Sequence, residues 1–137
     1  MRNDWTPPRF TMKYVCLAYE EENKLNSLTK SEWDSLRAET HSYVEDLRRR
    51  GTLFAAEPLQ SVHNATTVRV RGGRISLTDG PFAETKETLG GFFLIDAADL
   101  NEAIQIAANW PSARLGSIEV RAIEDGLKDI GRYEKKF

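Results

Sequence analysis

The chain has 137 residues with a hydrophobic fraction of 40%, which suits one globular domain with a buried core and is too short for two. Its formal net charge of −2 provides no overall basic field, so nucleic acid is not expected as a direct partner. No apolar run approaches the roughly 20 residues that a membrane span requires, so we expect no membrane contact.

Cys16 is the only cysteine of the chain. It lies in an apolar segment, so we expect a buried, unreactive thiol and no internal disulfide. This suits a reducing compartment, and the N-terminus lacks the apolar segment of a signal peptide, so we expect a cytoplasmic protein. Residues 1–11 contain consecutive prolines and no periodic pattern, which predicts a flexible N-terminal arm before a domain over 12–123. Residues 124–137 are polar and predict a C-terminal tail.

Two strands and a helix are predicted in the first third of the chain. Residues 13–19 are rich in aromatic and β-branched side chains, with apolar residues on both alternating faces. A second short strand is predicted over 52–57, ended by Pro58. Between them, a helix is predicted over about 30–50 because apolar residues recur at helical spacing.

The ends of this helix carry recognisable signals. Thr29 and Glu32 have the spacing of a capping box, in which each side chain bonds the backbone N–H of the other. Gly51 follows the last periodic residue and suits a C-terminal cap that needs positive φ.

The next two apolar runs, over 66–71 and 74–78, are separated by Gly72 and Gly73. A glycine pair suits a two-residue hairpin turn with positive φ at both positions. Apolar and polar residues alternate in both runs, so one face of the hairpin is expected to be wet. The apolar positions are Val68, Val70, Ile75 and Leu77.

The last third of the chain predicts a strand, a helix and a strand. Residues 91–96 are apolar on both faces, and 117–123 form the closing strand. Asp99 and Glu102 repeat the cap-to-acid spacing and start a helix that ends before Pro111. The inward stripe of this helix is predicted to consist of Leu100, Ala103, Ile104 and Ala107.

This element order predicts an α+β fold of the ferredoxin-like, split β-α-β type with an inserted β-hairpin. Two helices cover only one face of such a sheet, yet strands 13–19 and 91–96 are apolar on both faces. A second copy packed against the open face covers it most simply, because two-fold homodimers are the commonest oligomers. We therefore expect a homodimer.

The segment over 79–87 reads DGPFAETKE and precedes the buried run LGGFFLI over 89–95. Asp79, Gly80 and Pro81 are ordinary turn residues, and that structural role alone explains them. The charged residues that follow this turn suggest a functional role as well. If the connection folds over a pocket, Asp79 shares a site with one of two glutamates as general acid and base. The candidate catalytic residues are Asp79, Glu84 and Glu87, with Lys86 as electrostatic partner.

Four further residues are candidates for ligand binding. Tyr19 and Glu57 end neighbouring strands and are predicted to line the same pocket as the 79–87 connection, which also contributes Phe82. His41 falls on the flank of the apolar stripe of the first helix, where a half-exposed histidine without function is the alternative. The pair Gly90-Gly91 matches no phosphate-binding loop and predicts a close approach of backbone. The sequence has no metal-ligand spacing and predicts neither metal nor cofactor.

The segments DGPFAETKE and GGFFLI, with the strand start over 65–69 and the closing run over 119–121, resemble the DGPF-domain branch of the YCII-related proteins over about 12–123. This resemblance implies a dimeric α+β barrel. It also implies a helix histidine paired with a loop aspartate in related enzymes. The matching helix position here is closer to Thr40, next to His41, and the loop reads Asn109-Trp110-Pro111 without an aspartate.

Two functions follow from this reading. The first is a cofactor-free enzyme that carries out proton transfer, elimination or hydrolysis on a small polar substrate. Related proteins include an enzyme that removes chloride from a hydroxylated aromatic ring. The second is a non-catalytic ligand-binding or regulatory module, because the resemblance also associates this domain with extracytoplasmic-function sigma factors. Two carboxylates converging on one cavity favour the enzyme, whereas a solvated 79–87 connection favours the module.

Overall fold

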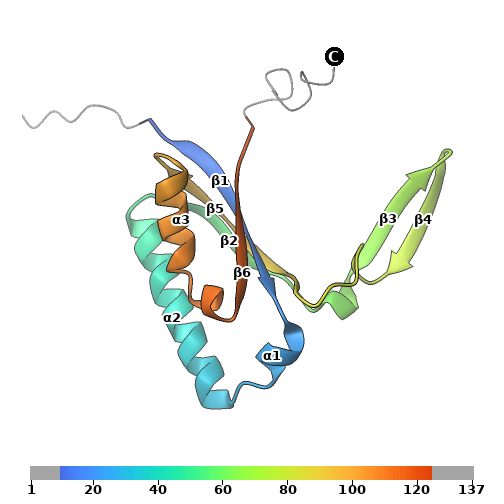
Figure 1. Cartoon of the computed structure of the whole chain (residues 1–137), viewed down its shortest axis with the longest axis horizontal. Coiled ribbons are helices and arrows are strands. Elements are labelled where there is room, and N and C mark those ends of the chain that lie inside the picture. Colours follow the sequence, from blue (N-terminus) through green and yellow to red (C-terminus); the bar gives the residue numbers. More distant parts are fainter. Residues whose placement is uncertain (1–9, 125–137) are drawn as a thin grey trace, which may run out of the picture.

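The computed structural model describes residues 10–124 and contains a four-stranded sheet with helices on one side and a separate two-stranded sheet (Figure 1). Residues 1–9 of the predicted N-terminal arm and 125–137 of the predicted tail lie outside this range. At the inner edge of the arm, the Thr11 hydroxyl donates a 2.8 Å hydrogen bond to the Asp96 carboxylate.

The chain begins with strand β1 (Met12–Glu20), a short helix α1 (Glu22–Asn26) and the long helix α2 (Lys30–Arg49). The predicted capping box of α2 is present: the Glu32 N–H donates to Thr29 Oγ1 at 3.1 Å, and the Thr29 N–H donates to Glu32 Oε1 at 2.9 Å. Helix α1 was not predicted.

Strand β2 (Leu53–Pro58) follows and leads through the short 3₁₀ helix η1 (Val62–Asn64) into strands β3 (Thr66–Arg71) and β4 (Arg74–Asp79). The turn between β3 and β4 has the geometry that the glycine pair predicted, with φ of 56° at Gly72 and 75° at Gly73.

Strand β5 (Thr88–Ala97) comes next, then helix α3 (Leu100–Ala108), the 3₁₀ helix η2 (Pro111–Arg114) and strand β6 (Gly116–Ala122). Within residues 10–124, no helix combines the length and the apolar character needed to cross a membrane.

The larger sheet has the strand order β2-β5-β1-β6, and every neighbouring pair is antiparallel. Strands β3 and β4 pair only with each other, also antiparallel. The predicted mixed α+β class is therefore confirmed, and the order of the larger sheet is compatible with a ferredoxin-like fold. The dimeric barrel stays a prediction.

The hydrophobic core lies between this sheet and the helices. Its fully buried side chains include Phe93 and Ile95 of β5, Cys16 of β1 and Leu47 of α2. Burial raises the pKa of the Cys16 thiol to about 12, so the thiol is protonated at neutral pH and unreactive, as expected.

The predicted inward stripe of α3 is partly wrong. Ala103 and Ala107 are buried as expected, but Leu100 and Ile104 are 52% and 45% exposed, and Ile106 is buried instead. Helix α3 is apolar on several sides, so periodicity alone did not identify the side that contacts the sheet.

The other face of the sheet is also apolar. Along β1, the core residues Tyr14, Cys16 and Ala18 alternate with Val15 and Leu17, which point to the opposite side. We call this surface the open face. Its further large apolar side chains are Phe54, Phe92 and Leu94.

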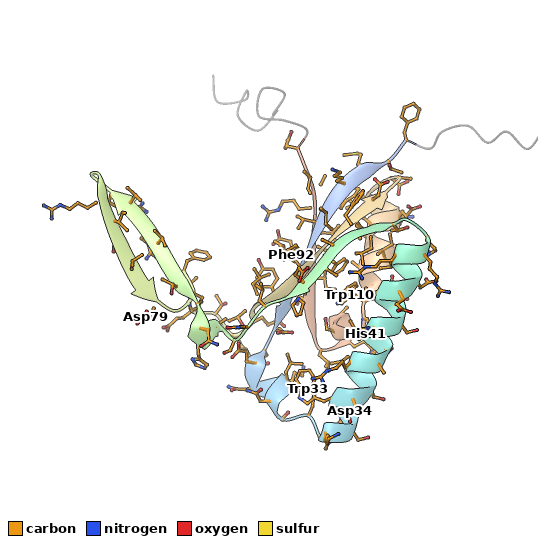
Figure 2. All side chains as sticks on the ribbon, turned by 180° about the vertical axis from the view of Figure 1, so that it is seen from behind. Trp33, Asp34, His41, Asp79, Phe92 and Trp110 are labelled. Carbon is orange, nitrogen blue, oxygen red and sulfur yellow. The ribbon has the colours of Figure 1, made fainter. Side chains whose placement is uncertain are left out.

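Strands β3 and β4 form an arm that extends from the body on the side of the sheet away from α2, as Figures 1 and 2 show. The four apolar side chains of this arm occupy two opposed cross-strand pairs and therefore share one face. Their exposed fractions are high. The values are 60% for Val68, 57% for Val70, 72% for Ile75 and 66% for Leu77.

Candidate functional site

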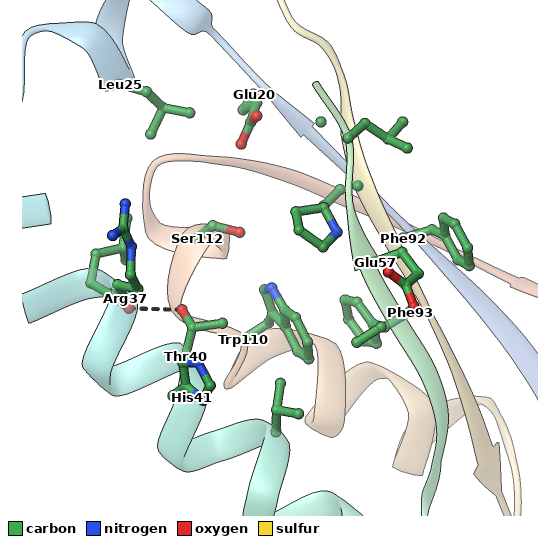
Figure 3. Close-up of a pocket in the computed structure, with 18 of the residues that line it drawn as sticks. Glu20, Leu25, Arg37, Thr40, His41, Glu57, Phe92, Phe93, Trp110 and Ser112 are labelled. Atoms are coloured by element: carbon green, nitrogen blue, oxygen red, sulfur yellow. Dashed lines mark hydrogen bonds between the residues drawn. The ribbon is translucent and has the colours of Figure 1, made fainter. Parts of the chain in front are cut away.

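A cavity of about 660 Å³ lies between α2 and the sheet, near the ends of β1, β2 and β5 (Figure 3). Its walls combine aromatic and aliphatic side chains with several charged ones. The lining residues that the following argument uses are Glu20, Arg37, Thr40, His41, Glu57 and Trp110.

Two stacked rings form the aromatic wall of the cavity. Phe93 and Trp110 lie nearly parallel, with centroids 3.9 Å apart and an interplanar angle of 8°. Tyr43 meets Trp110 edge-on at 5.9 Å, and its hydroxyl donates a 2.8 Å hydrogen bond to the Ile106 carbonyl. These contacts hold the indole in a fixed orientation, so the cavity has a rigid, apolar wall.

Glu20, at the end of β1, is partly buried in the cavity wall. A Cβ at Gly90 on β5 would lie 2.0 Å from Glu20 Oε1 and 2.2 Å from its Cδ. The missing side chain of Gly90 therefore provides the space that the Glu20 carboxyl occupies. The close approach predicted for the Gly90-Gly91 pair is confirmed here, and Gly91 similarly lies against the backbone of Glu57.

The environment of Glu20 disfavours its charged form. Burial raises the pKa of the Glu20 carboxyl, and the negative charge of Glu22 raises it further. Within the described range 10–124, no hydrogen bond or ion pair involves this carboxyl. Glu20 is thus a partly buried carboxyl on the cavity wall with no hydrogen-bond or ion-pair partner among these residues.

Glu22 itself is held in place by the loop that leads to the arm. Its carboxylate accepts a 3.0 Å hydrogen bond from Ser61 Oγ and a 2.8 Å bond from the Val62 N–H. The charge that acts on Glu20 is therefore fixed by a contact between α1 and the base of the arm.

Helix α2 supplies the opposite wall of the cavity. Arg37 lies one turn before Thr40 and His41 on this helix (Figure 3). The Arg37 guanidinium lies 5.9 Å from the centre of the Trp33 ring, in cation–π contact. The Thr40 hydroxyl donates to the Leu36 carbonyl at 2.8 Å, which fixes its rotamer and leaves its oxygen able to accept a further bond.

The predicted ligand-binding residues divide between two places. His41 and Glu57 are among the residues that line the cavity, but Glu57 pairs with Phe92 of β5, so its side chain lies on the side of the open face. Tyr19 lies between the cavity residues Ala18 and Glu20 on β1, so its side chain points to the open face.

The predicted catalytic residues lie outside the cavity lining. Asp79 ends β4 on the arm, far from the labelled cavity residues in Figure 2, and Glu84 and Lys86 are exposed on the connection over 80–87. Phe82 is 80% exposed. Glu87 accepts a 2.8 Å hydrogen bond from Ser117 Oγ and thereby attaches the connection to β6. A catalytic role for these residues stays a prediction.

Comparison with known proteins identifies a family. The model of the YCII-related domain matches residues 12–126. The chain belongs to the YCII-related family. An uncharacterized protein of Rhizobium meliloti (strain 1021) is 35% identical over 114 residues, which cover 82% of this chain and 92% of that protein.

Two positions that the resemblance singled out lie at the cavity. The resemblance placed a functional helix position at or near Thr40 and a functional loop at 109–111. Thr40, His41 and Trp110 all line the cavity. In this YCII-related chain, the helix position and the 109–111 loop therefore both contribute residues to the cavity lining.

Sequence reasoning missed Glu20, Arg37 and Trp110 as members of this site. Glu20 had a usable signal, because it follows Tyr19 directly and strand alternation places the two side chains on opposite faces. For Arg37 and Trp110, the sequence shows only a helical pattern and a turn pattern, and neither indicates a place in the site. Among residues 10–124, no three His, Cys, Asp or Glu side chains gather closely enough to hold a metal ion.

Proposed function

We propose that the cavity binds a small organic molecule and that Glu20 exchanges a proton with it, in a cofactor-free proton transfer, elimination or hydrolysis. The observation that carries this proposal is the Glu20 carboxyl in the wall of a cavity of about 660 Å³, because burial raises its pKa and no residue of the described range 10–124 pairs with it. A carboxyl whose pKa moves toward the working pH is an effective general acid or base.

The rest of the cavity suits a ligand with one apolar, planar side and one polar side. The Phe93–Trp110 stack offers an apolar wall, while Arg37 and His41 on α2 offer hydrogen-bond donors. In this proposal His41 and Arg37 orient the ligand. Asp79, Glu84, Glu87 and Lys86 are alternative catalytic groups that the same experiment tests.

The test compares Glu20→Gln with Glu84→Gln in the full chain. Compounds from a set of small carboxylated and phenolic molecules are added to the isotopically labelled protein, and backbone amide NMR shifts report where they bind. We expect shifts at Glu20, His41 and Trp110, and a loss of binding or turnover of about tenfold or more in Glu20→Gln alone. Shifts confined to 79–87, with the loss in Glu84→Gln, would refute the proposal.

Stability provides an independent check on Glu20. Because its folded-state pKa is raised, the contribution of Glu20 to stability is fully present below the unfolded pKa and is lost as pH rises through the folded pKa. Glu20→Gln removes that loss, so its melting temperature should exceed that of the wild type near about pH 7 and converge with it near about pH 3. If Glu20→Gln is less stable than the wild type at neutral pH, the charged form of Glu20 is not disfavoured in the folded state.

A second candidate is a regulatory module that binds a ligand without turnover and contacts an extracytoplasmic-function sigma factor. The exposure of Glu84 and Lys86 on the connection over 80–87 favours it, because these side chains are available to a protein partner. Charge reversal at both positions, Glu84→Lys with Lys86→Glu, should then abolish co-sedimentation with a purified sigma factor. Retained binding, or no binding by the wild type, would exclude this role.

We also propose that the protein is a homodimer in which two open faces pack together. The support is the row of apolar side chains on the face of the sheet opposite α2 and α3, including Val15, Leu17 and Phe92. Sedimentation equilibrium at micromolar concentration tests it, and a folded monomer would refute it. Leu17→Asp should dissociate the dimer without entering the core between sheet and helices.

A further inference from the structure

We propose that the β3–β4 arm clasps a second copy of the chain, with its apolar face against the partner. This inference rests on the proposed homodimer and adds a second contact to it. Its starting point is the set of four aliphatic side chains, Val68, Val70, Ile75 and Leu77, which share one face of the arm and are each more than half exposed.

The exposed apolar face of the arm needs a partner surface that buries it. A two-stranded hairpin with nothing packed against it is at best marginally stable in water. In the described chain, β3 and β4 contact chiefly each other, and the ribbon extends clear of the body (Figure 1). A second copy of the same chain is a cover that is present whenever the chain folds, and two-fold homodimers are the commonest oligomers.

The areas of the two apolar surfaces, the face of the arm and the open face, indicate that one partner covers both. With strands about 4.8 Å apart and a rise of about 3.3 Å per residue, the two six-residue strands of the arm present roughly 200 Å². The four-stranded sheet presents roughly 400 Å² over the seven residues of β6. A stable interface needs about 800 Å² of accessible surface per partner, so the arm alone is too small, whereas the two faces together approach that scale.

The placement of the arm makes this joint contact possible. It projects on the same side of the sheet as the open face, away from α2 (Figures 1 and 2). Packed sheets lie about 10 Å apart, whereas a six-residue strand is about 20 Å long. A body seated on the open face is therefore within reach of the arm, and two-fold symmetry makes the contact reciprocal.

The test compares two cross-strand pairs at neighbouring positions of the same arm. Val70 and Ile75 form a pair on the apolar face, and Arg69 and Ser76 form the adjacent pair on the other face. The test variant is Val70→Thr with Ile75→Thr, and the control is Arg69→Thr with Ser76→Thr. Threonine keeps a high β-propensity, so both variants retain the hairpin.

The first readout is the dimer dissociation constant from sedimentation, with circular dichroism to establish that each variant is folded. We expect the apolar-face variant to weaken dimerisation by about tenfold to a hundredfold and the control to change it by less than about threefold. The second is hydrogen exchange of the β3 and β4 amides, which should accelerate when wild-type protein is diluted below its dissociation constant.

Three other combinations of results would each contradict the proposal in a different way. If the wild type is a dimer and Leu17→Asp dissociates it while the apolar-face variant does not, the clasp is refuted and the homodimer stands. A monomeric wild type refutes both. If the apolar-face variant remains a dimer but no longer binds a sigma factor that the wild type binds, the arm contacts that protein instead of a second copy.

Discussion

The body and the arm use the same kind of strand in opposite ways. In β5, Phe93 and Ile95 alternate with partly exposed residues and are buried to within 1% exposure, because α2 and α3 lie over them. In the arm, Val70 and Ile75 follow the same alternation and are more than half exposed, because no element of the described chain covers them. Alternation therefore predicts which side chains share a face, while burial depends on what packs there.

Truncation of an aromatic residue should give the largest difference in stability loss between the body and the arm region. Phe93→Ala removes half of the Phe93–Trp110 stack and leaves a cavity in the core, so we expect the free energy of unfolding to fall by about 3–5 kcal/mol. Phe82→Ala, on the connection that follows the arm, should change it by about 0.5 kcal/mol or less, because Phe82 is already exposed. Urea unfolding measures both, and equal losses would mean that Phe82 is covered.

Helix α3 allows a comparison of two isoleucines in one element. Ile106 packs in the core, and Ile106→Ala should lower the free energy of unfolding by about 2–5 kcal/mol. Ile104 lies on the exposed side, so Ile104→Ala should cost about 1 kcal/mol or less. If urea unfolding shows a larger loss for Ile104→Ala than for Ile106→Ala, the inward stripe predicted from the sequence is correct after all.

Glycines of the two regions should respond to alanine for different reasons. Gly72, in the arm turn, has open space around it but a φ of 56°, so Gly72→Ala should cost about 1–2 kcal/mol and Gly72→Asn less. Gly90→Ala in the body should cost less stability, because only the flexible end of Glu20 must move. It should instead lower the pKa of Glu20 by driving the carboxyl into solvent, which NMR titration detects.

The smallest expected effect concerns Glu22, where the arm base and the cavity meet. Glu22→Gln keeps an acceptor for the Val62 N–H and removes the charge that raises the pKa of Glu20, so that pKa should fall. Carboxyl NMR titration measures the shift, with Glu84→Gln as a control that should cause none. An unchanged Glu20 pKa in Glu22→Gln would leave burial as its only cause.

The candidate site was only partly predictable from the sequence. His41 and Glu57, two of the residues predicted to bind a ligand, are among those that line the cavity, because strand ends and a helix flank meet at one end of such a sheet. The connection over 79–87 was expected there too, but it follows the arm and is largely exposed, with Glu87 bonded to Ser117. The path of a connection between two sheets depends on how the sheets are oriented, and local turn chemistry carries no information about that.

By itself, the sequence determined what depends on neighbouring residues. The α2 capping box at Thr29 and the positive φ of Gly72 and Gly73 follow from short-range sterics and hydrogen bonding. Only the tertiary structure decided the rest. It placed the Glu20 carboxyl over Gly90, stacked Trp110 on Phe93 and left the arm uncovered, because each result depends on contacts between segments far apart in the chain.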